Sequence, residues 1–522
     1  MSEGVAAMTS DVGGLLESVI SADIAAPASS PASFCHGGHE TMQEAARAAG
    51  KSDQLAAMLA DYPRGPHDQP QSMCPAFGSL RVGLRMRRVA TILSGSACCV
   101  YGLTFTAHFY GARRSVGYVP FNSETLVTGQ LFEDIRQAVI TTARPDDYDA
   151  VVVINLCVPT ASGVPLDLLP KAIDGVRIIG IDVPGFGVPT HAEAKDVLAG
   201  AMLRYARGEA EEGPVARPRM PRAETLPTVA LIGELFPADP VGIGALLAPM
   251  GLGVAPPIPA REWRDLYAAL DSVAAAAVHP FYTASVREFH AAGRPVVGSA
   301  PVGLAGTEAW LETLGRAIGI DAAAIDAAKA AALPKIAAAL AAHPLAARIM
   351  VSGYEGSELL VARLLLEAGA EVPYVGTACP ATEWSRADRD WLVANGAHVQ
   401  YRASLEQDMA AMRAVRPDLV FGTTPLVQKA KESGIPAVYF TNIVSARPLF
   451  GASGATALAE IVTTQLRGRE RLTRMMSFFD AVGRDEASGY GWTEVPKAPP
   501  GARERARQAR AARSRAADAV GS

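Results

Sequence analysis

The chain has 522 residues, of which 49% are hydrophobic and 19% charged, and its formal net charge is −5. This composition is typical of a globular protein of about three domains, and the slightly acidic balance argues against nucleic-acid binding, which favours a basic face. The six cysteines show no paired spacing, the N-terminus has no signal-peptide pattern, and no apolar run is long enough to span a membrane. We expect a cytoplasmic protein without a transmembrane segment.

The N-terminal part of the chain is expected to be an arm followed by a first α/β unit. Residues 1–70 are rich in Ala, Ser and Pro and contain one expected helix at 40–61. The unit at 71–220 has expected strands at 89–93, 115–120, 151–156 and 176–183, and helices at 123–142 and 191–207. Asn122 or Ser123 is the expected N-cap of the first helix. Residues 208–227 are rich in Pro and charged residues and are expected to form a linker.

Two further units of the same kind follow. The second, 221–345, has expected strands at 228–234, 272–278 and 295–298 and helices at 307–318 and 321–342. The third, 346–455, has expected strands at 348–353, 372–376, 418–422 and 437–440 and a helix at 355–368. Residues 456–522 are expected to form a C-terminal helix at 458–478 and an Arg/Ala-rich tail. Strands that alternate with helices predict parallel sheets, so the expected fold is α/β with three tandem Rossmann-like units.

Three cysteines stand beside the ends of expected strands or in a neighbouring loop of the first unit. Cys74 lies in a turn-rich loop, Cys99 follows the strand that begins at Val89, and Cys157 ends the strand that begins at Ala150. The carboxyl ends of parallel strands face one crevice, where ligands collect. The pattern therefore predicts one thiolate metal site. Three thiolates leave a four-iron cluster one ligand short.

The residues alone leave alternatives open for these cysteines. Each could be a buried, purely structural residue, because free cysteine packs well in cores. If they bind metal, thiolate ligands favour zinc or iron–sulfur, although structural zinc usually shows close Cys pairs that are missing here. Cys98 and Cys99 would point opposite ways in an extended chain, so one of them can bind while the other packs.

The other cysteines are expected not to bind metal. Cys35 lies in Cys35-His-Gly-Gly-His39, whose spacing fits no zinc signature well. Cys379, in the third unit, is expected to pack in the core. The glycines around Gly185 form no dinucleotide motif, and no phosphate-binding loop occurs, so the chain is expected to bind neither NAD nor ATP. Electrons for any redox reaction would then come from a protein partner.

Three runs resemble the nitrogenase component-1 α-subunit superfamily. They are Cys74-Pro-Ala-Phe-Gly, Leu93-Ser-Gly-Ser-Ala-Cys-Cys-Val-Tyr-Gly102 and Asn155-Leu-Cys157. They are similar to the cysteine segments with which that superfamily holds an iron–sulfur cluster, and alignment on Gly95 makes Cys99 the ligand. Within the superfamily, the runs at 35–43 and 109–129 resemble Y-type subunits of chlorophyllide a reductases. The likeness covers nearly the whole chain except the arm and the tail.

The resemblance implies a catalytic subunit that reduces the C7=C8 bond in ring B of chlorophyllide a. It implies a [4Fe-4S] cluster on Cys74, Cys99 and Cys157, with the fourth ligand from a homologous Z-type subunit in a heterotetramer. It also implies an X-type reductase homodimer, which hydrolyses ATP, carries a second [4Fe-4S] cluster and docks transiently. The implied location is the cytoplasm, with peripheral association with the photosynthetic membrane as an alternative.

A departure from nitrogenase supports a pigment substrate. Nitrogenase holds its large metal cofactor with a cysteine in the second unit and a histidine in the third. The stretch 274–282 has no cysteine and the stretch 441–450 has no histidine. The resemblance therefore implies that the cofactor cavity is free for a tetrapyrrole.

Two roles remain open at this stage. His108 is a candidate proton donor, although a core histidine with satisfied hydrogen bonds is the alternative. The arginines Arg81, Arg85, Arg87 and Arg88 follow Cys74 closely and either steer an acidic partner towards the cluster or solvate a helix face. The rival function for the whole chain is a non-catalytic scaffold on which metal clusters are assembled.

Overall fold

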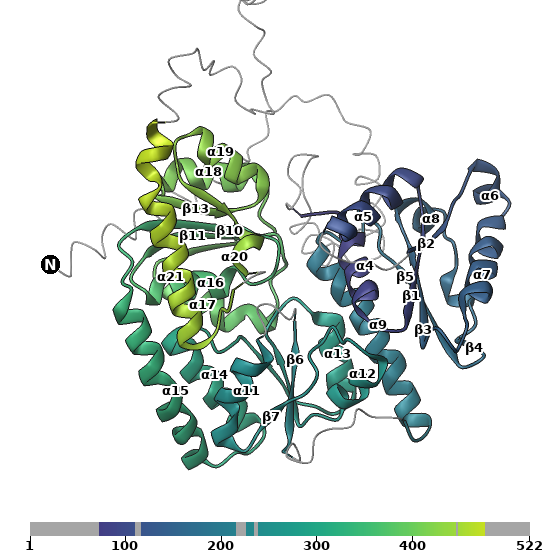
Figure 1. The fold of residues 1–522 in the computed structure, drawn as a ribbon, viewed down its shortest axis with the longest axis horizontal. Helices are drawn as coiled ribbons and strands as arrows, with labels where there is room; N and C mark the ends of the chain where they lie inside the picture. The colour runs from purple at the N-terminus through teal and green to yellow at the C-terminus, as the bar shows by residue number, and fades with distance from the viewer. Residues whose placement is uncertain (1–71, 110–115, 216–225, 234–238, 445–446, 475–522) are drawn as a thin grey trace, which may run out of the picture.

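The computed structural model describes residues 72–109, 116–215, 226–233, 239–444 and 447–474. They form three α/β lobes around a common centre (Figure 1). The first lobe is purple to blue, the second teal, and the third green to yellow. Each lobe contains one sheet, and the sheets span 89–182, 228–298 and 348–439. The expected α/β fold with parallel sheets is confirmed, whereas the domain limits stay a prediction.

The first sheet has the strand order β2-β1-β3-β5-β4. Its strands are β1 Val89–Ser94, β2 Val116–Val119, β3 Ala150–Asn155, β4 Ala172–Ile173 and β5 Val176–Asp182. All pairs are parallel except β4 with β5. Every residue of β1 and β3 is buried, as expected for central strands covered by helices on both faces.

The helices of the first lobe differ in several places from the sequence-based expectation. They are α4 Pro75–Arg85, α5 Ala97–Phe109, α6 Ser123–Val127, α7 Gln130–Thr142, α8 Cys157–Ala161 and α9 His191–Glu212. Helices α4, α5 and α8 were not predicted. The expected helix at 123–142 is broken at Gly129, whose φ of 75° is in the left-handed region. Helix α9 continues past the predicted start of the linker, and Asn122 is the N-cap of α6.

The second and third sheets are entirely parallel, with strand orders β7-β6-β8-β9 and β12-β11-β10-β13-β14. The second lobe contains β6 Thr228–Ile232, α11 Pro240–Leu247, β7 Gly253–Val254, α12 Trp263–Leu270, β8 Ala274–Ala277, α13 Thr283–Ala291, β9 Val296–Gly298, α14 Gly303–Ala317 and α15 Ala322–Ala342. The third contains β10 Arg348–Gly353, α16 Glu358–Glu367, β11 Glu371–Thr377, α17 Arg386–Ala394, β12 His398–Tyr401, α18 Leu405–Val415, β13 Leu419–Gly422, α19 Thr424–Glu432, β14 Ala437–Tyr439, α20 Phe440–Val444 and α21 Gly451–Arg467.

The lobes share apolar cores. One large cluster includes Phe77 of the first lobe and Trp263 of the second, and another includes Trp310 of the second and Phe421 of the third. Helix α9 runs from the centre along the first lobe to the second (Figure 1). Burial of this apolar area fixes the lobes relative to one another, because apolar surface removed from water favours association. Within the described residues, no helix is long and apolar enough to cross a membrane.

Candidate metal centre and its surroundings

The three cysteines singled out by the sequence lie at one edge of the first sheet, each at the start of a helix. Cys74 is the N-cap of α4, Cys99 is the third residue of α5, and Cys157 is the first residue of α8. Helices α5 and α8 follow the carboxyl ends of β1 and β3, which are adjacent strands. A helix N-terminus carries partial positive charge and favours an anion such as a thiolate.

Close packing holds two of the cysteine turns together. The last residues of β1 and β3, Ser94 and Asn155, are register partners, and the N–H of Leu156 donates to the Ser94 carbonyl over 2.9 Å. Gly95 follows at once, and a Cβ there would lie 2.5 Å from Leu156 Cδ1. Only glycine therefore lets the turn towards Cys99 pass so close to the residue before Cys157.

Backbone N–H groups point at two of the sulfurs. The N–H of Gly185, in the loop after β5, donates to Cys157 Sγ over 3.2 Å. The backbone N–H groups of Ala76 and Phe77 form hydrogen bonds with Cys74 that favour its thiolate and act to lower its pKa. Hydrogen bonds of this kind stabilise a thiolate and tune the potential of a bound iron–sulfur cluster. Gly185 was noted in the sequence only as part of an incomplete nucleotide motif.

The three thiols are close enough to influence one another. Burial raises the pKa of Cys74, and the charge of Cys157 raises it further. Burial also raises the pKa of Cys99, and the charges of Cys98, Cys74 and Cys157 add to that effect. Three thiolates that repel one another gain most from a shared cation or cluster. The donor set therefore fits a bound iron–sulfur group.

The arrangement differs from a site for a single ion. Among the described residues, no three His, Cys, Asp or Glu side chains form a group compact enough for one metal ion. An iron–sulfur cluster attaches each thiolate to its own iron, so its cysteines stand farther apart than the ligands of one ion. The structure thus places the three sulfurs together without the tight geometry of a zinc site.

The cysteine edge is exposed and apolar. Cys74, Cys98, Cys99 and Cys157 are all exposed at the surface, although neighbouring atoms shield the Cys74 and Cys99 sulfurs enough to raise their pKa values. Nearby surface residues include Tyr101 and Phe105 of α5, with exposed fractions of 71% and 63%, and Phe186 beside Gly185, with 61%. The rings of Tyr101 and Phe105 stack with centroids 6.3 Å apart. Exposed apolar patches of this kind mark interaction surfaces.

The other candidate residues have different environments. Cys379 is fully buried beside Ala192 and Phe281, so its packing role is confirmed. Cys98 is exposed on α5 and approaches Ser96 Oγ at 3.0 Å, whereas Cys35 lies outside the described residues. His108 is exposed in the last turn of α5, where Nδ1 lies 3.0 Å from the Thr104 carbonyl, so the interpretation as a core histidine is wrong.

The expected position of Arg87 and Arg88 beside the cysteine loops is wrong, whereas a steering role of the arginines stays a prediction. Helix α4 carries the chain about 16 Å away from Cys74 before it reaches them. Arg88 is paired with Asp149, and Arg87 with Glu262 of the second lobe, at the amino-terminal edge of the first sheet. Neighbourhood in the sequence therefore did not mean neighbourhood in space.

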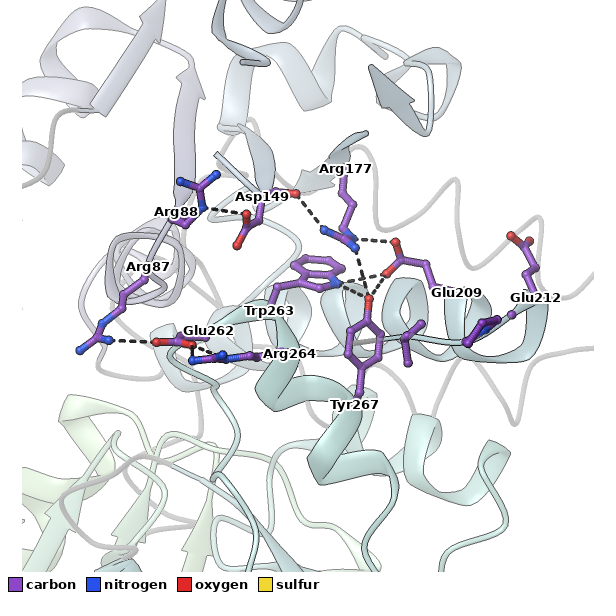
Figure 2. Close-up of a pocket in the computed structure, with 13 residues that line it drawn as sticks. Arg87, Arg88, Asp149, Arg177, Glu209, Glu212, Glu262, Trp263, Arg264 and Tyr267 are labelled. Carbon is purple, nitrogen blue, oxygen red and sulfur yellow. Dashed lines mark hydrogen bonds and ion pairs between the residues drawn. The ribbon is translucent and has the colours of Figure 1, made fainter. Parts of the chain in front are cut away.

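A cavity of about 860 Å³ lies at that opposite edge. Figure 2 shows Arg177 above Trp263, with Glu209 accepting from Arg177 and from Tyr267. Most of its charged groups are paired: Arg87 with Glu262 of the second lobe, and Arg88 with Asp149 and Arg177 with Glu209 within the first lobe. We assign no ligand to it, because it is remote from the cysteines and most of its charged groups already pair with one another.

A buried charged cluster, which the sequence did not predict, fills the junction of the three lobes. His191 and Lys195 of α9 lie 3.3 and 3.5 Å from Glu355 Oε2, and Thr441 donates to Glu355 Oε1 over 2.8 Å. A Cβ on Gly356 would approach Phe281 at 2.8 Å. Phe281 of the stretch 274–282 and Thr441 of the stretch 441–450 both lie at this cluster, whereas the expected cavity for a tetrapyrrole stays a prediction.

Comparisons with known proteins identify the family. The family model "Nitrogenase component 1 type Oxidoreductase" matches residues 74–467. A protein of Cereibacter sphaeroides named "Chlorophyllide reductase 52.5 kDa chain" is 64% identical over 475 residues, which is 91% of this chain and 94% of that protein. A protein of the same name from Rhodobacter capsulatus is 63% identical over 474 residues, 91% of this chain and 95% of that protein.

More distant similarities agree with this result. One of the light-independent protochlorophyllide reductase subunits of Methylobacterium radiotolerans is 26% identical over 443 residues, 80% of this chain and 81% of that protein. A solved structure titled "Nitrogenase Cp1 at pH 6.5" has a TM-score of 0.60 and 17% identity, and the match covers 79% of this chain and 95% of that one. This last likeness concerns the fold alone. The chain belongs to the nitrogenase component 1 type oxidoreductases.

Proposed function

We propose that this chain is the Y-type catalytic subunit of a chlorophyllide a reductase and acts in the reduction of the C7=C8 bond in ring B. The observation that carries the proposal is the 64% identity, over nearly the full length of both chains, to a protein named as a chlorophyllide reductase chain. The reaction adds two electrons and two protons across one C=C bond. The product is a bacteriochlorophyll precursor.

In this proposal Cys74, Cys99 and Cys157 hold a [4Fe-4S] cluster. The convergence of three thiols at helix N-termini and the N–H of Gly185 on Cys157 support these ligands. Such a cluster, when bound, supplies one-electron transfer at low potential. The surrounding residues hold the thiolates as anions and set the polarity around them.

A homologous Z-type subunit completes the site in a heterotetramer of two chains of each kind. Three thiolates leave one iron without a cysteine, so the fourth ligand is assigned to the partner. The exposed Tyr101, Phe105 and Phe186 around the cysteine edge support a protein cover there. We expect the chain purified alone to lack a stable four-iron cluster.

The electron donor is proposed to be a separate X-type reductase homodimer that carries its own [4Fe-4S] cluster and hydrolyses ATP. The sequence has no glycine-rich phosphate-binding loop of its own. ATP should therefore bind neither this chain nor its complex with the Z-type subunit, although pigment reduction should require ATP hydrolysis. Docking over the cysteine edge would bring the two clusters close.

Anaerobic reconstitution tests the function. The purified complex of this chain with its partner subunit is mixed with the reductase dimer, ATP and chlorophyllide a, and pigment absorbance is followed. Loss of the chlorophyllide band and growth of the ring-B-reduced product, dependent on ATP, is the expected result. A complex that neither binds nor converts the pigment would contradict the proposal and favour a scaffold for cluster assembly.

A further inference from the structure

Cys74 is supported differently from the other two cysteines of the site. Cys99 and Cys157 follow β1 and β3, and the ladder between these adjacent strands fixes one relative to the other. Cys74 precedes every strand of the first sheet and is the N-cap of α4. Its place relative to the other two sulfurs therefore depends on what packs against α4.

The first turn of α9 contacts the chain on both sides of Cys74. The backbone N–H of His191 donates to Ser72 Oγ over 3.0 Å, two residues before the cysteine. Four residues after the cysteine, a Cβ on Gly78 would collide with the carbonyl oxygen of His191. Only glycine lets α4 and α9 approach so closely. The backbone at His191 thus fixes the segment that carries Cys74.

Helices α4 and α9 are joined further along as well. The fully buried Ser79 of α4 donates its hydroxyl to the carbonyl of Ala194 on α9. Figure 1 shows α4 alongside α9. Because interiors are close-packed, a shift of the first turn of α9 would move the start of α4 with it.

This first turn is tied to the third lobe by an ion pair between Glu193 and Arg402. Arg402 follows β12, and its two terminal nitrogens donate to Glu193 Oε2 and Oε1 over 2.7 and 2.9 Å. It also donates to the carbonyl of Ala378, after β11, over 3.1 Å. Such a two-pronged pair fixes orientation as well as distance.

The Glu193 carboxylate also holds the N-cap of α9. The hydroxyl of Thr190 donates to Glu193 Oε2 over 2.7 Å and accepts from the backbone N–H of Glu193 over 3.2 Å. One carboxylate thus connects the third lobe with the residue at which α9 begins. A change of its partner would be felt at the adjoining His191.

The backbone of Arg402 does not favour an arginine. Its φ of 53° lies in the left-handed region, which glycine and asparagine adopt more readily. Residues held in such conformations gather at functional sites. The side chains of Arg402 and Glu193 are only 16% and 19% exposed, so water screens their attraction in part. The contact with Glu193 accounts for an arginine here, whereas the local backbone does not.

Adhesion between the lobes has other sources. The junction cluster, made of His191, Lys195, Glu355 and Thr441, also joins α9 to the third lobe. The shared apolar cores add to it. The pair of Glu193 and Arg402 contributes what these contacts lack, namely parallel hydrogen bonds that orient the turn beside Cys74.

We propose that Glu193 and Arg402 are positioning residues of the cysteine site. Through this pair and the first turn of α9, the third lobe sets where the Cys74 sulfur stands relative to those of Cys99 and Cys157. This inference rests on the proposed function, in which the three thiolates hold a [4Fe-4S] cluster. The two residues act through the backbone that carries Cys74, as outer partners of metal ligands do.

The test compares variants of the full complex with its partner subunit. Arg402→Gln and Glu193→Gln each break the pair, and Arg402→Lys keeps the charge without the fork. Arg207→Gln is the matched control, because Arg207 also joins α9 to another lobe. It pairs with Glu288 of the second lobe over 3.1 Å and is 25% exposed, but it lies far along the helix from Cys74.

The readouts are the electron paramagnetic resonance spectrum of the reduced complex, its midpoint potential and the rate of iron release to a chelator. Arg402→Gln and Glu193→Gln should change the g values and the potential and release iron at least about tenfold faster. Arg402→Lys should fall between them and the wild type, because a lysine cannot form both hydrogen bonds in parallel. Arg207→Gln should match the wild type.

Two further measurements separate positioning from general stability. Thermal unfolding should shift by similar amounts in Arg402→Gln and Arg207→Gln, since each loses one ion pair between lobes. The double variant of Glu193→Gln and Arg402→Gln should release iron no faster than either single variant, because either change already breaks the same pair. Should Arg402→Gln fail to fold, Glu193→Gln, which keeps the side-chain size, carries the same comparison.

Two results would overturn the positioning role while the cluster assignment stands. One is a wild-type spectrum, potential and rate of iron release in Glu193→Gln and Arg402→Lys. The other is an equal change of all three in Arg207→Gln. A wild-type complex that contains no iron–sulfur cluster would overturn the proposed function, and the positioning role with it.

Discussion

The backbone N–H of Gly185 donates a hydrogen bond to Cys157 Sγ over 3.2 Å. The bond joins the loop after β5 to the turn after β3, and a Cβ on residue 185 would still lie at an ordinary 3.6 Å from the sulfur. The effect of the Gly185 N–H on the sulfur can therefore be tested separately from the effect of a side chain at this position.

Gly185→Pro removes the N–H, and Gly185→Ala keeps it. A hydrogen bond to a thiolate stabilises the more negative, reduced state of an attached cluster, so its loss should lower the midpoint potential by roughly 50 mV. Gly185→Ala should leave the potential near the wild-type value. The measurement is a redox titration of the complex followed by electron paramagnetic resonance. Equal shifts in both variants would mean that packing, rather than the hydrogen bond, sets the potential.

Tyr101 and Phe105 should bind the partner subunit. The double variant Tyr101→Ser and Phe105→Ser removes two large exposed side chains next to the cysteines, and we expect it to weaken the complex at least about tenfold because buried aromatic residues dominate interface energies. Val393→Ser, which changes an exposed apolar residue on α17 of the third lobe, is the control. Sedimentation measurements of the mixed subunits would decide it. Unchanged association in the double variant would exclude α5 from the interface.

The sequence predicted the positions of the cysteines because parallel sheets bring strand ends together, whatever the side chains are. It missed α5, since the residues after Ser96 are apolar on all sides and include aromatic residues and Gly102. Such a helix has no polar face in the isolated chain to reveal its period. In the folded chain, the aromatic residues Tyr101 and Phe105 on one side of this helix remain exposed.

Two other failures have equally physical causes. Arg87 and Arg88 were placed beside Cys74 because they are close in sequence, but an intervening helix separates them in space. The junction cluster joins His191 to Glu355, which are 164 positions apart and come from different lobes. No local pattern marks such a pair, because it arises only when the lobes pack together.

Asp408 should make the stability of the protein depend on pH. Burial raises its pKa to about 7, while Ser352 and Tyr374 donate to it over 2.6 and 3.0 Å. The folded state therefore binds this proton more tightly than the unfolded chain, and the resulting stabilisation, full at low pH, is lost as the pH rises through about 7.

Asp408→Asn cannot lose a proton, so its free energy of unfolding should change less between pH 5 and pH 8 than that of the wild type. The changes in unfolding free energy of the two proteins between these pH values should differ by on the order of 2 kcal/mol. Chemical denaturation at both pH values measures it. Parallel pH profiles would show that Asp408 is already ionised in the folded protein at pH 5.

The central claim is that Cys74, Cys99 and Cys157 hold the cluster, and the neighbouring pair Cys98 and Cys99 gives its most direct test. Both side chains are exposed on the first turn of α5, so they differ little in burial or stability. Iron and sulfide are measured in the anaerobically purified complex for Cys99→Ser and Cys98→Ser, with Cys74→Ser, Cys157→Ser and Cys35→Ser alongside. We predict loss or distortion of the cluster in Cys74→Ser, Cys99→Ser and Cys157→Ser, because oxygen is a harder ligand for iron, and near wild-type content in Cys98→Ser and Cys35→Ser. Intact iron in Cys99→Ser would contradict the assignment.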